Sequence, residues 1–552
     1  MLHYLTFYLL QIHLMLGIAV KAESNQGVSS VNDKVDVMAF FSNHILTELQ
    51  DESNHSARPM VKATAIKFAS TFRNQFSKEH LSALMPLLIS HLHSPSVVVH
   101  TYSASAIEKF LICKDATGKQ AKFGGQEIKP FLEPLFSALF AIVDNAEFNE
   151  NEYVMKCIMR SLSSARDDIV QVTQIVLEKL TAALFVVAKN PRNPQYNHYM
   201  FESIAVLVKS VCGKHPEHVA TFESLLFPPF QTVLQMDVAE FTPYVFQILG
   251  QLCEYRPENS GLGEAYGMLL APRLSPVLWE RRGNIPALTR LLQAYLMKGS
   301  PEIVSMGQLN GMLGVFQKLI SSKASEISAF DLLAAITQFV PSESLDPLLK
   351  SIFQILLMRL QQGKTPRYVR LVSGYFAQFV GQYGSEKTFA VLNSIQPGLS
   401  LMMLAQIWIP RLAEDLPVRM EAKIQVVGLT KLVCETPSLL SDATGQQIWM
   451  QALIATTKIL TSQESYLGAP TDNGDQDAEI GYDPTMSRLN FATRSPLDPF
   501  SNITNVAQYF ARALGQARAA NGAAIQQLMQ QGQNVDPKTF SALEGILSKV
   551  GM

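Results

Sequence analysis

The sequence is short of cysteine, of charge and of strand-type alternation, and each shortage excludes a class of protein. Its five cysteines are odd in number, far apart and free of any C-x-x-C pair. A disulfide framework and a cysteine zinc site are therefore not expected, and the thiols are predicted to be buried in a reducing compartment. Charged residues make up 17% of the chain and the formal net charge is −2. That balance gives no general attraction for nucleic acid or for an acidic membrane surface, so neither nucleic-acid binding nor membrane insertion is expected.

Motifs that carry chemistry are also scarce. No phosphate-binding loop, G-x-S-x-G elbow or H-E-x-x-H helix occurs in the sequence. His91, His93 and His100 cluster without an acidic or cysteine ligand, and His215 and His218 are only two candidate ligands. We interpret both groups as ordinary loop or helix-end histidines. The sequence thus predicts no enzyme, no catalytic residue, no metal site and no cofactor.

The N-terminus leaves two interpretations open. Residues 4–20 are apolar, and Val20-Lys21-Ala22 resembles a small-residue cleavage site, but no basic residue precedes Lys21. A buried helix is preferred. The alternative, in which residues 1–22 act as a signal peptide, predicts a secreted protein glycosylated at the Asn502 sequon.

Apolar residues, by contrast, are plentiful: they form 47% of a chain of 552 residues and recur at helical spacing along nearly all of it. Between residues 35 and 460 the stripes predict successive helices joined by short connections with Pro, Gly, Asn or Ser. Helix pairs recur about every 40 residues, which is the period of HEAT or armadillo units. The predicted fold is therefore all-α, a right-handed α-solenoid of HEAT-type antiparallel helix pairs.

One helix pair, Leu274–Leu296, carries the candidate functional residues. Gly283 is expected to end the first helix in a left-handed conformation, Asn284 to cap the second, and Pro286 to occupy its first turn. The corner between the helices should point outward. Trp and Arg are frequent anchors of interfaces, so the partner-binding candidates are the exposed corner residues Trp279, Glu280, Arg281, Arg282 and Asn284. The competing interpretation is that Trp279 only closes the core.

The stretch from Glu464 to Asp483 has six carboxylates and no basic residue among Gly, Pro, Ser and Asn. Such a composition predicts a flexible acidic loop or linker. The expected organisation is an atypical N-terminus (1–11), a HEAT solenoid (12–462), the acidic loop (463–490) and closing C-terminal helices (491–552).

Several stretches of the sequence are distinctive, namely FFSNHIL (40–46), FRNQFSKEHL (72–81), VVVHTYSASAIEKF (97–110), NEYVMKCIMRS (151–161), EFTPYVFQIL (240–249) and VLWERRGNIPALTRLLQAYL (277–296). In this order they resemble the exportin-2, or cellular apoptosis susceptibility, family of the importin-β/karyopherin superfamily. The resemblance extends over about residues 12 to 552 and corresponds to the C-terminal half of the family's members.

This resemblance implies a HEAT solenoid that binds importin-α with RanGTP for nuclear export and shuttles between nucleus and cytoplasm. The missing N-terminal half holds the family's main Ran contact, so a truncated form should bind RanGTP weakly or not at all. The alternative is a HEAT scaffold or partner-binding fragment without export activity of its own.

Overall fold

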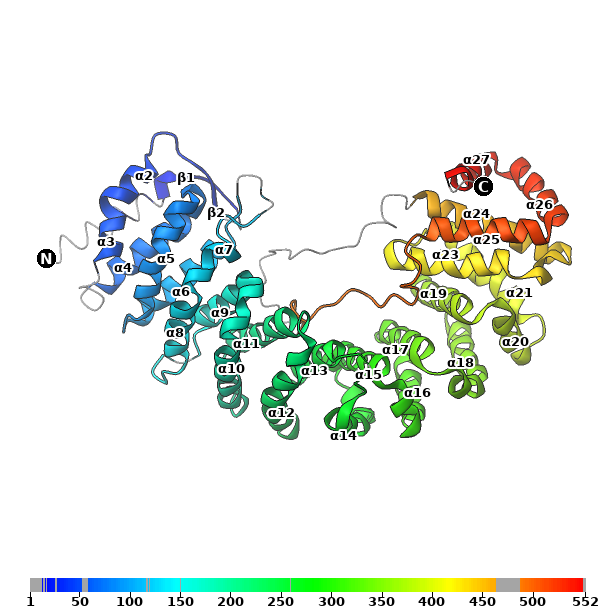
Figure 1. The fold of residues 1–552 in the computed structure, drawn as a ribbon, viewed down its shortest axis with the longest axis horizontal. Coiled ribbons are helices and arrows are strands. Elements are labelled where there is room, and N and C mark those ends of the chain that lie inside the picture. The colour runs from blue at the N-terminus through cyan, green and yellow to red at the C-terminus, as the bar shows by residue number, and fades with distance from the viewer. Residues whose placement is uncertain are drawn as a thin grey trace. The chain divides into compact units, whose positions relative to one another are not determined.

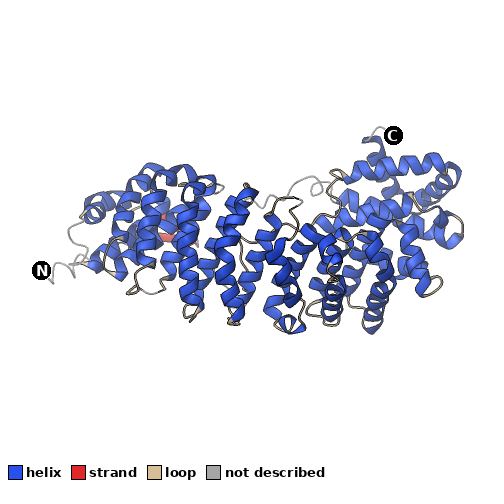
Figure 2. Cartoon of the chain, turned by 60° about the horizontal axis from the view of Figure 1, so that its bottom comes forward, coloured by secondary structure: helices blue, strands red, loops and turns tan. Residues whose placement is uncertain are grey.

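In the computed structural model, two compact units are present, and the described residues are 12, 15, 17–24, 27–51, 58–115, 118, 120–148, 150–258, 260–462 and 487–549. Unit 1 comprises residues 1–260 and 475–493, and unit 2 comprises residues 261–474 and 494–552. Helices dominate the described part of both units (Figures 1 and 2).

Unit 1 consists of two layers of helices that pack side by side (Figure 1). In the first layer each helix contacts the next one of the layer, and the members are α4 (Pro59–Thr71), α6 (Val97–Leu111), α9 (Glu152–Ala165), α11 (Pro194–Leu207) and α13 (Thr242–Tyr255). The second layer covers it with α5 (Lys78–Leu92), α8 (Leu132–Val143), α10 (Thr173–Ala188) and α12 (Val219–Gln235). Shorter elements are α2 (Val37–Phe40), η1 (Phe41–Ile45), α3 (Leu46–Gln50), η3 (Arg73–Gln75), α7 (Gly125–Ile128), η4 (Lys129–Phe131), η5 (Arg166–Val172), η6 (Val208–Cys212) and η7 (Pro216–His218).

Unit 2 repeats this arrangement. Its first layer is α15 (Ile285–Ser305), α17 (Glu326–Phe339), α19 (Pro366–Tyr383), α23 (Arg419–Cys434) and α25 (Val506–Ala520). Against it lie α14 (Gly263–Arg273), α16 (Leu309–Ile320), α18 (Ser342–Gln362), α20 (Ser385–Ile395), α22 (Ile409–Glu414), α24 (Ala443–Ser462), α26 (Gly522–Val535) and α27 (Pro537–Lys549). Shorter elements are η8 (Pro276–Trp279), η9 (Arg282–Asn284), α21 (Leu399–Met403), η10 (Leu404–Trp408) and η11 (Pro437–Leu440).

The helices begin where local chemistry favours a start. Asn151 accepts backbone N–H bonds at the start of α9, and Asn193 does so at the start of α11, where Pro194 follows. Thr365 and Asn505 cap α19 and α25 in the same way. The apolar stripes face the space between the layers, so each helix pair is held by the pair beside it. The predicted all-α, HEAT-type solenoid is thus confirmed.

A two-stranded antiparallel sheet, β1 (Val20–Ser24) and β2 (Gly27–Val31), was not predicted. Val28 is buried, and its carbonyl accepts a bond from the Asn74 side chain at 3.1 Å. Five-residue strands are too short to show clear alternation. The sheet includes Val20, Lys21 and Ala22, the stretch that resembles a cleavage site. The predicted helix at 4–20 and the atypical residues 1–11 fall mostly outside the described residues.

All five cysteines are free thiols. Cys113, Cys157, Cys212 and Cys253 are buried in unit 1, while Cys434 is partly buried in unit 2. Burial raises the pKa of Cys212 to about 12 and that of Cys434 to about 12. None of the five cysteines forms a disulfide, and the predicted burial is confirmed for the four cysteines of unit 1.

The stretch Glu152–Ala188 is long and apolar enough to cross a membrane by length and composition alone, as is a bent pair, Ser385–Ile395 with Leu399–Glu414. The first stretch is not one straight helix. Arg166, with φ of +49°, separates α9 from η5, and α9 lies between α6 and α11 in the first layer of unit 1. Only 33% of its most apolar window is buried, so packing between helices accounts for part of its apolar character.

Two extended stretches follow the acidic region, which itself lies outside the described residues up to 486. Residues 487–493 belong to unit 1 and contact α11 and α13. The stretch that follows belongs to unit 2, where the Lys423 ammonium lies 2.6 Å from Asp498 and Phe500 packs against Gly381. The final residues of the predicted acidic loop are thus anchored.

Candidate functional site

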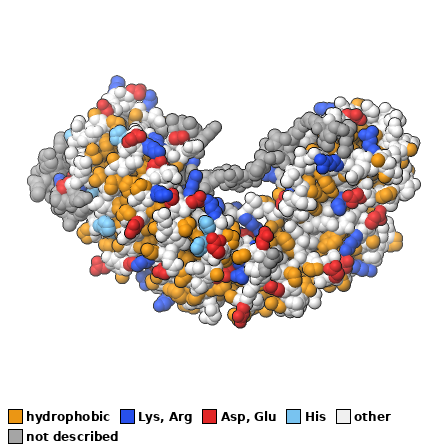
Figure 3. Space-filling view, in the orientation of Figure 1, with side chains coloured by type: hydrophobic (Ala, Val, Ile, Leu, Met, Phe, Trp, Pro, Cys, Tyr) orange, Lys and Arg blue, Asp and Glu red, His pale blue; other side chains and the backbone are white. Residues whose placement is uncertain are grey.

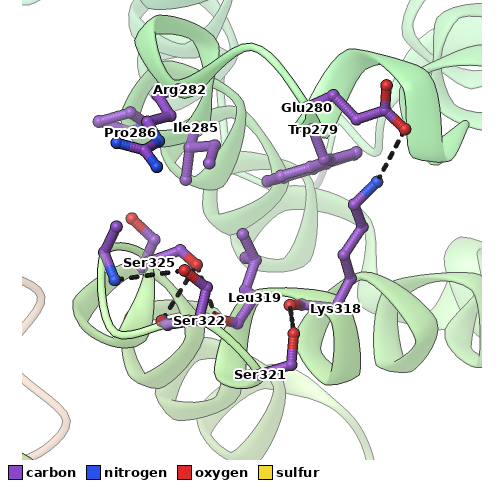
Figure 4. A pocket seen from close by; sticks show the side chains of 12 residues that line it. Trp279, Glu280, Arg282, Ile285, Pro286, Lys318, Leu319, Ser321, Ser322 and Ser325 are labelled. Atoms are coloured by element: carbon purple, nitrogen blue, oxygen red, sulfur yellow. Dashed lines mark hydrogen bonds and ion pairs between the residues drawn. The ribbon is translucent and has the colours of Figure 1, made fainter.

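The corner between α14 and α15 forms one wall of a surface pocket in unit 2 (Figure 4). The opposite wall is the corner between α16 and α17, the next helix pair along the chain. The cavity has a volume of about 290 Å³. It is lined by Trp279, Glu280, Arg282, Ile285, Pro286, Lys318, Leu319, Ser321, Ser322, Ala324, Ser325 and Ser328. Three of the five predicted partner-binding residues therefore line one pocket.

Two roles were considered for Trp279, a partner contact and a side chain that only closes the core. Its side chain is buried, with 3% exposed, and the indole Nε1 donates a hydrogen bond to the Arg273 carbonyl at 2.9 Å. That bond ties η8 back to the end of α14 and satisfies the polar end of the ring. The ring also lines the pocket wall, facing Leu319 in Figure 4. Trp279 therefore closes the core and also shapes the pocket.

Lys318 joins the two walls electrostatically. Its ammonium donates to the Pro276 carbonyl at 2.8 Å and lies 3.4 Å from the Glu280 carboxylate. The Glu280 side chain is 66% exposed and that of Lys318 is 37% exposed, so the ion pair is weak and its members can exchange for groups of a partner. Arg281 and Arg282 are exposed beside it. The rim of the pocket thus presents two arginines and an exchangeable lysine–glutamate pair.

The opposite wall of the pocket contains serines whose hydroxyls donate hydrogen bonds to backbone carbonyls of the same corner. Ser325 donates to the Leu319 carbonyl at 2.7 Å, and Ser321 donates to the Lys318 carbonyl at 2.6 Å. These bonds fix the α16–α17 turn. The pocket lining contains no histidine or cysteine.

Two expectations about the corner were wrong. Gly283 does not have a positive φ; it lies within η9, and the chain turns through two short 3₁₀ segments instead of one left-handed residue. Asn284 does not cap α15 with its side chain. It is 1% exposed, and its Nδ2 donates to the Leu278 carbonyl at 3.4 Å. Asn284 therefore stabilises the corner from inside and is inaccessible to a partner, whereas Pro286 does occupy the first turn of α15.

His91 lies in the last turn of α5 and His100 in the first turn of α6, in agreement with their interpretation as helix-end histidines. The buried His91 and His100 rings bond to the carbonyls of Leu49 and Ser94 at 2.9 and 3.2 Å. In the part of the chain that the structure describes, no group of three His, Cys, Asp or Glu side chains is arranged to hold a metal ion.

Lys318 and the serines of the second wall were missed from the sequence. A signal for them exists: the period of about 40 residues that identifies the repeat also places the residues near 318–322 beside Glu280. Lys318 and Glu280 are 38 residues apart in the sequence. Adding one repeat length to the residue numbers of the α14–α15 corner predicts the residues of the opposite wall.

The comparisons with known proteins agree with this architecture. Residues 108–544 match the family model described as "CAS/CSE protein, C-terminus", and residues 7–107 match the model described as "Cse1". The chain is 38% identical over 505 residues to Exportin-2 of Mus musculus, covering 90% of this chain and 51% of that protein. It is 37% identical over 545 residues to Exportin-2 of Oreochromis niloticus, covering 97% of this chain and 55% of that protein.

Among solved structures, the chain is similar to "The exportin Cse1 in its cargo-free, cytoplasmic state". The TM-score is 0.83 at 29% identity, over 98% of this chain and 55% of that one. The chain spans about half the length of the curated relatives it matches. Because one family model alone covers more than half of the chain and the helix-pair fold agrees, the resemblance seen in the sequence is confirmed, and this chain belongs to the CAS/CSE protein family, the family of the exportin-2 proteins.

Proposed function

We propose that this chain acts in nuclear transport as a karyopherin-type receptor of the exportin-2 kind, which binds importin-α together with RanGTP for export from the nucleus. The observation that carries the proposal is the 38% identity to Exportin-2 across 90% of the chain, joined to the family match over residues 108–544. A HEAT stack also offers a long surface of paired helices on which another protein can lie. Exportins are transport receptors and not enzymes, which agrees with the pocket chemistry.

The chain corresponds to about half of its relatives, and this bears on affinity. A receptor that grips two partners with both halves gains from the second contact being effectively intramolecular. A chain that supplies one half alone should hold importin-α less tightly and respond weakly to RanGTP. Shuttling between nucleus and cytoplasm follows from the same role, and nothing supports the secreted alternative.

The test is a pull-down of purified importin-α by the immobilised chain, with and without Ran loaded with a non-hydrolysable GTP analogue. Retention of importin-α that increases with GTP-bound Ran is the expected result. Retention that is indifferent to Ran would instead support a HEAT scaffold or partner-binding fragment without export activity. No retention under either condition would refute importin-α binding by this chain.

We also propose that the α14–α15 corner is a partner contact, through Trp279, Glu280, Arg281 and Arg282. The mixture of a ring edge, two exposed arginines and an exchangeable ion pair suits an extended segment of a partner that carries an acidic and an apolar side chain. Arg282→Glu should lower retention of importin-α several-fold. Arg512→Glu, on an exposed face of α25, is the matched control because it makes the same charge change away from the corner. Equal retention by the two variants would remove the corner from the interface.

A further inference from the structure

Outside the corner, the most organised polar site lies on unit 1, between α11 and α13. Three buried side chains form it: Glu202 of α11, with 0% exposed, and Gln247 and Gln251 of α13, with 8% and 1% exposed. Gln247 and Gln251 are four residues apart and so share one face of their helix. We call these three residues the α11–α13 clamp. The corner contact proposed above does not involve them.

The clamp holds residues 487–492 of the same chain, which we call the cis segment. The Glu202 carboxylate accepts the backbone N–H of Asn490 at 2.6 Å, the Asn490 side-chain amide at 3.1 Å and the backbone N–H of Phe491 at 3.1 Å. His198, whose Nε2 is 3.7 Å away, is too distant for a hydrogen bond. All hydrogen bonds to this carboxylate within the described residues therefore come from the cis segment.

The two glutamines extend the same recognition along the backbone. Gln247 accepts from the Leu489 N–H at 2.9 Å and donates to the Ser487 carbonyl at 2.6 Å. Gln251 donates to the Phe491 carbonyl at 3.1 Å. The clamp thus engages both donors and acceptors of an extended chain, as the neighbouring strand of a sheet does.

Side chains of the cis segment add selectivity. Leu489, Phe491 and Ala492 are buried, with 0%, 8% and 1% exposed, while Asn490 reaches Glu202. The site therefore reads a Leu-Asn-Phe-Ala pattern: two apolar anchors, an amide between them and a small residue after them. A clamp left empty would expose buried acceptors and donors without partners, which is costly. Such a site requires an occupant.

We propose that the α11–α13 clamp is a peptide-binding site, that the cis segment is its built-in ligand, and that an extended peptide with the Leu-Asn-Phe-Ala pattern binds there in trans when the cis segment is undocked. The cis segment is covalently attached and competes at a high effective concentration. A peptide of equal intrinsic affinity is therefore excluded from the wild-type chain. Weakening the cis segment opens the site to it.

The experiment measures fluorescence polarisation of a fluorescein-labelled peptide of residues 487–495, SRLNFATRS, titrated with the full chain. The variant Asn490→Ala/Phe491→Ala removes one clamp contact and one apolar anchor from the cis segment only. This undocked variant should bind the peptide at least about tenfold more tightly than the wild type does. A peptide carrying the same two alanines should bind to neither chain.

Two further variants place the binding at the clamp. Glu202→Gln in the undocked background turns an acceptor into a donor that faces the Phe491 N–H, and should weaken binding of the peptide about tenfold or more. Gln195→Ala, an exposed change on the same helix, is the control and should leave it unchanged. Equal binding to wild type and undocked variant, or no effect of Glu202→Gln, would overturn the proposal.

An independent readout needs no variant. Amide hydrogen exchange of the wild-type chain should show residues 489–491 protected, with slower exchange than in the free peptide. Should the double variant unfold, Asn490→Ala alone gives the same test with a smaller increase in affinity. An undocked variant with wild-type circular dichroism that fails to bind the peptide would refute the peptide site, as would unprotected amides at 489–491.

Discussion

A buried ion pair lies next to the α16–α17 corner, which forms the opposite wall of the surface pocket. Arg359 of α18 donates to the carboxylate of Glu326, the first residue of α17, and the two are 7% and 1% exposed. The guanidinium also lies 4.9 Å from the centre of the Tyr368 ring. Glu326 follows Ser325 directly, so this pair fixes the turn that carries the serines of the pocket.

Replacing Arg359 by Met keeps most of the side-chain volume but leaves the Glu326 carboxylate buried without its main partner. Removing one member of a buried ion pair typically costs about 3–5 kcal/mol. Here the lower figure, about 3 kcal/mol, is expected, because the Arg367 Nε lies 3.8 Å from the other carboxylate oxygen and is half exposed. Loss of the contact with Tyr368 adds to this cost.

Tryptophan fluorescence reports on this unit alone. The three tryptophans of the chain, Trp279, Trp408 and Trp449, all lie in unit 2 and are 3%, 2% and 0% exposed. For domains of this size, 1 kcal/mol shifts the thermal midpoint by about 2–4 °C, so Arg359→Met should lower the midpoint by roughly 6–12 °C.

A matched variant separates burial from charge. Lys318→Met breaks a similar pair, with Glu280, whose members are 37% and 66% exposed. It should shift the midpoint by about 2 °C or less. Glu326→Gln added to Arg359→Met should restore much of the stability by removing the unpaired charge. Equal shifts for Arg359→Met and Lys318→Met would refute the role assigned to burial.

Three further predictions concern other parts of the chain. Burial raises the pKa of Glu202 from 4.5 to about 7, against the hydrogen bonds that it accepts. A raised carboxyl pKa gives stability that is full below pH 4.5 and is lost as the pH rises through 7, about 3 kcal/mol in total. Hydrogen exchange of α11 and α13, corrected for intrinsic rates, should therefore show wild-type stability falling relative to Glu202→Gln between pH 5 and pH 8; a constant difference would contradict the raised pKa. Gly428→Ala should destabilise unit 2 by about 1–3 kcal/mol in fluorescence-detected unfolding, because a Cβ there meets the backbone of Ala377 in α19, whereas Gly314→Ala, in open space within α16, should be neutral or stabilising. Gly283→Ala should change the thermal midpoint by less than about 2 °C, because the φ of Gly283 is not positive and nothing lies within 4 Å of the added Cβ. A larger decrease in the midpoint would support the left-handed conformation instead.

The repeating helices could be predicted because their causes are local. The stripe of Leu288, Leu291, Leu292 and Leu296 is buried as its spacing requires, and Asn193-Pro194 begins α11 as its chemistry favours. A HEAT unit needs only this pattern and a neighbour with the same pattern. Fold class therefore followed from the sequence alone.

The corner was predicted only in part, because its geometry depends on contacts across a repeat. Gly and Asn in sequence suggested a left-handed stop with a side-chain cap. Two 3₁₀ segments satisfy the same backbone groups, and the Trp279 indole bond to Arg273 together with the buried Asn284 amide fixes the path. A single helix pair contains no information on Lys318, which comes from the next pair.

The cis segment could not be found from the sequence at all. Residues 487–490 follow an acidic stretch and share its loop-like composition, so the pattern indicated flexibility. Their partners lie 240 to 289 residues away along the chain. On its own helix Glu202 lies 3.7 Å from His198, a contact that gives no sign of the cis segment, and only the folded unit brings Glu202 and the cis segment together.

The distribution of thiols gives the chain a natural set of reporters. Four of its five cysteines are buried in unit 1, which has no tryptophan, and the fifth is Cys434 in unit 2. A thiol reagent reaches such a side chain only during an opening of the surrounding helices. Mass spectrometry of alkylated thiols can therefore measure the rate of local opening in unit 1 at each of Cys113, Cys157, Cys212 and Cys253. Tryptophan fluorescence reports on unit 2 in the same sample.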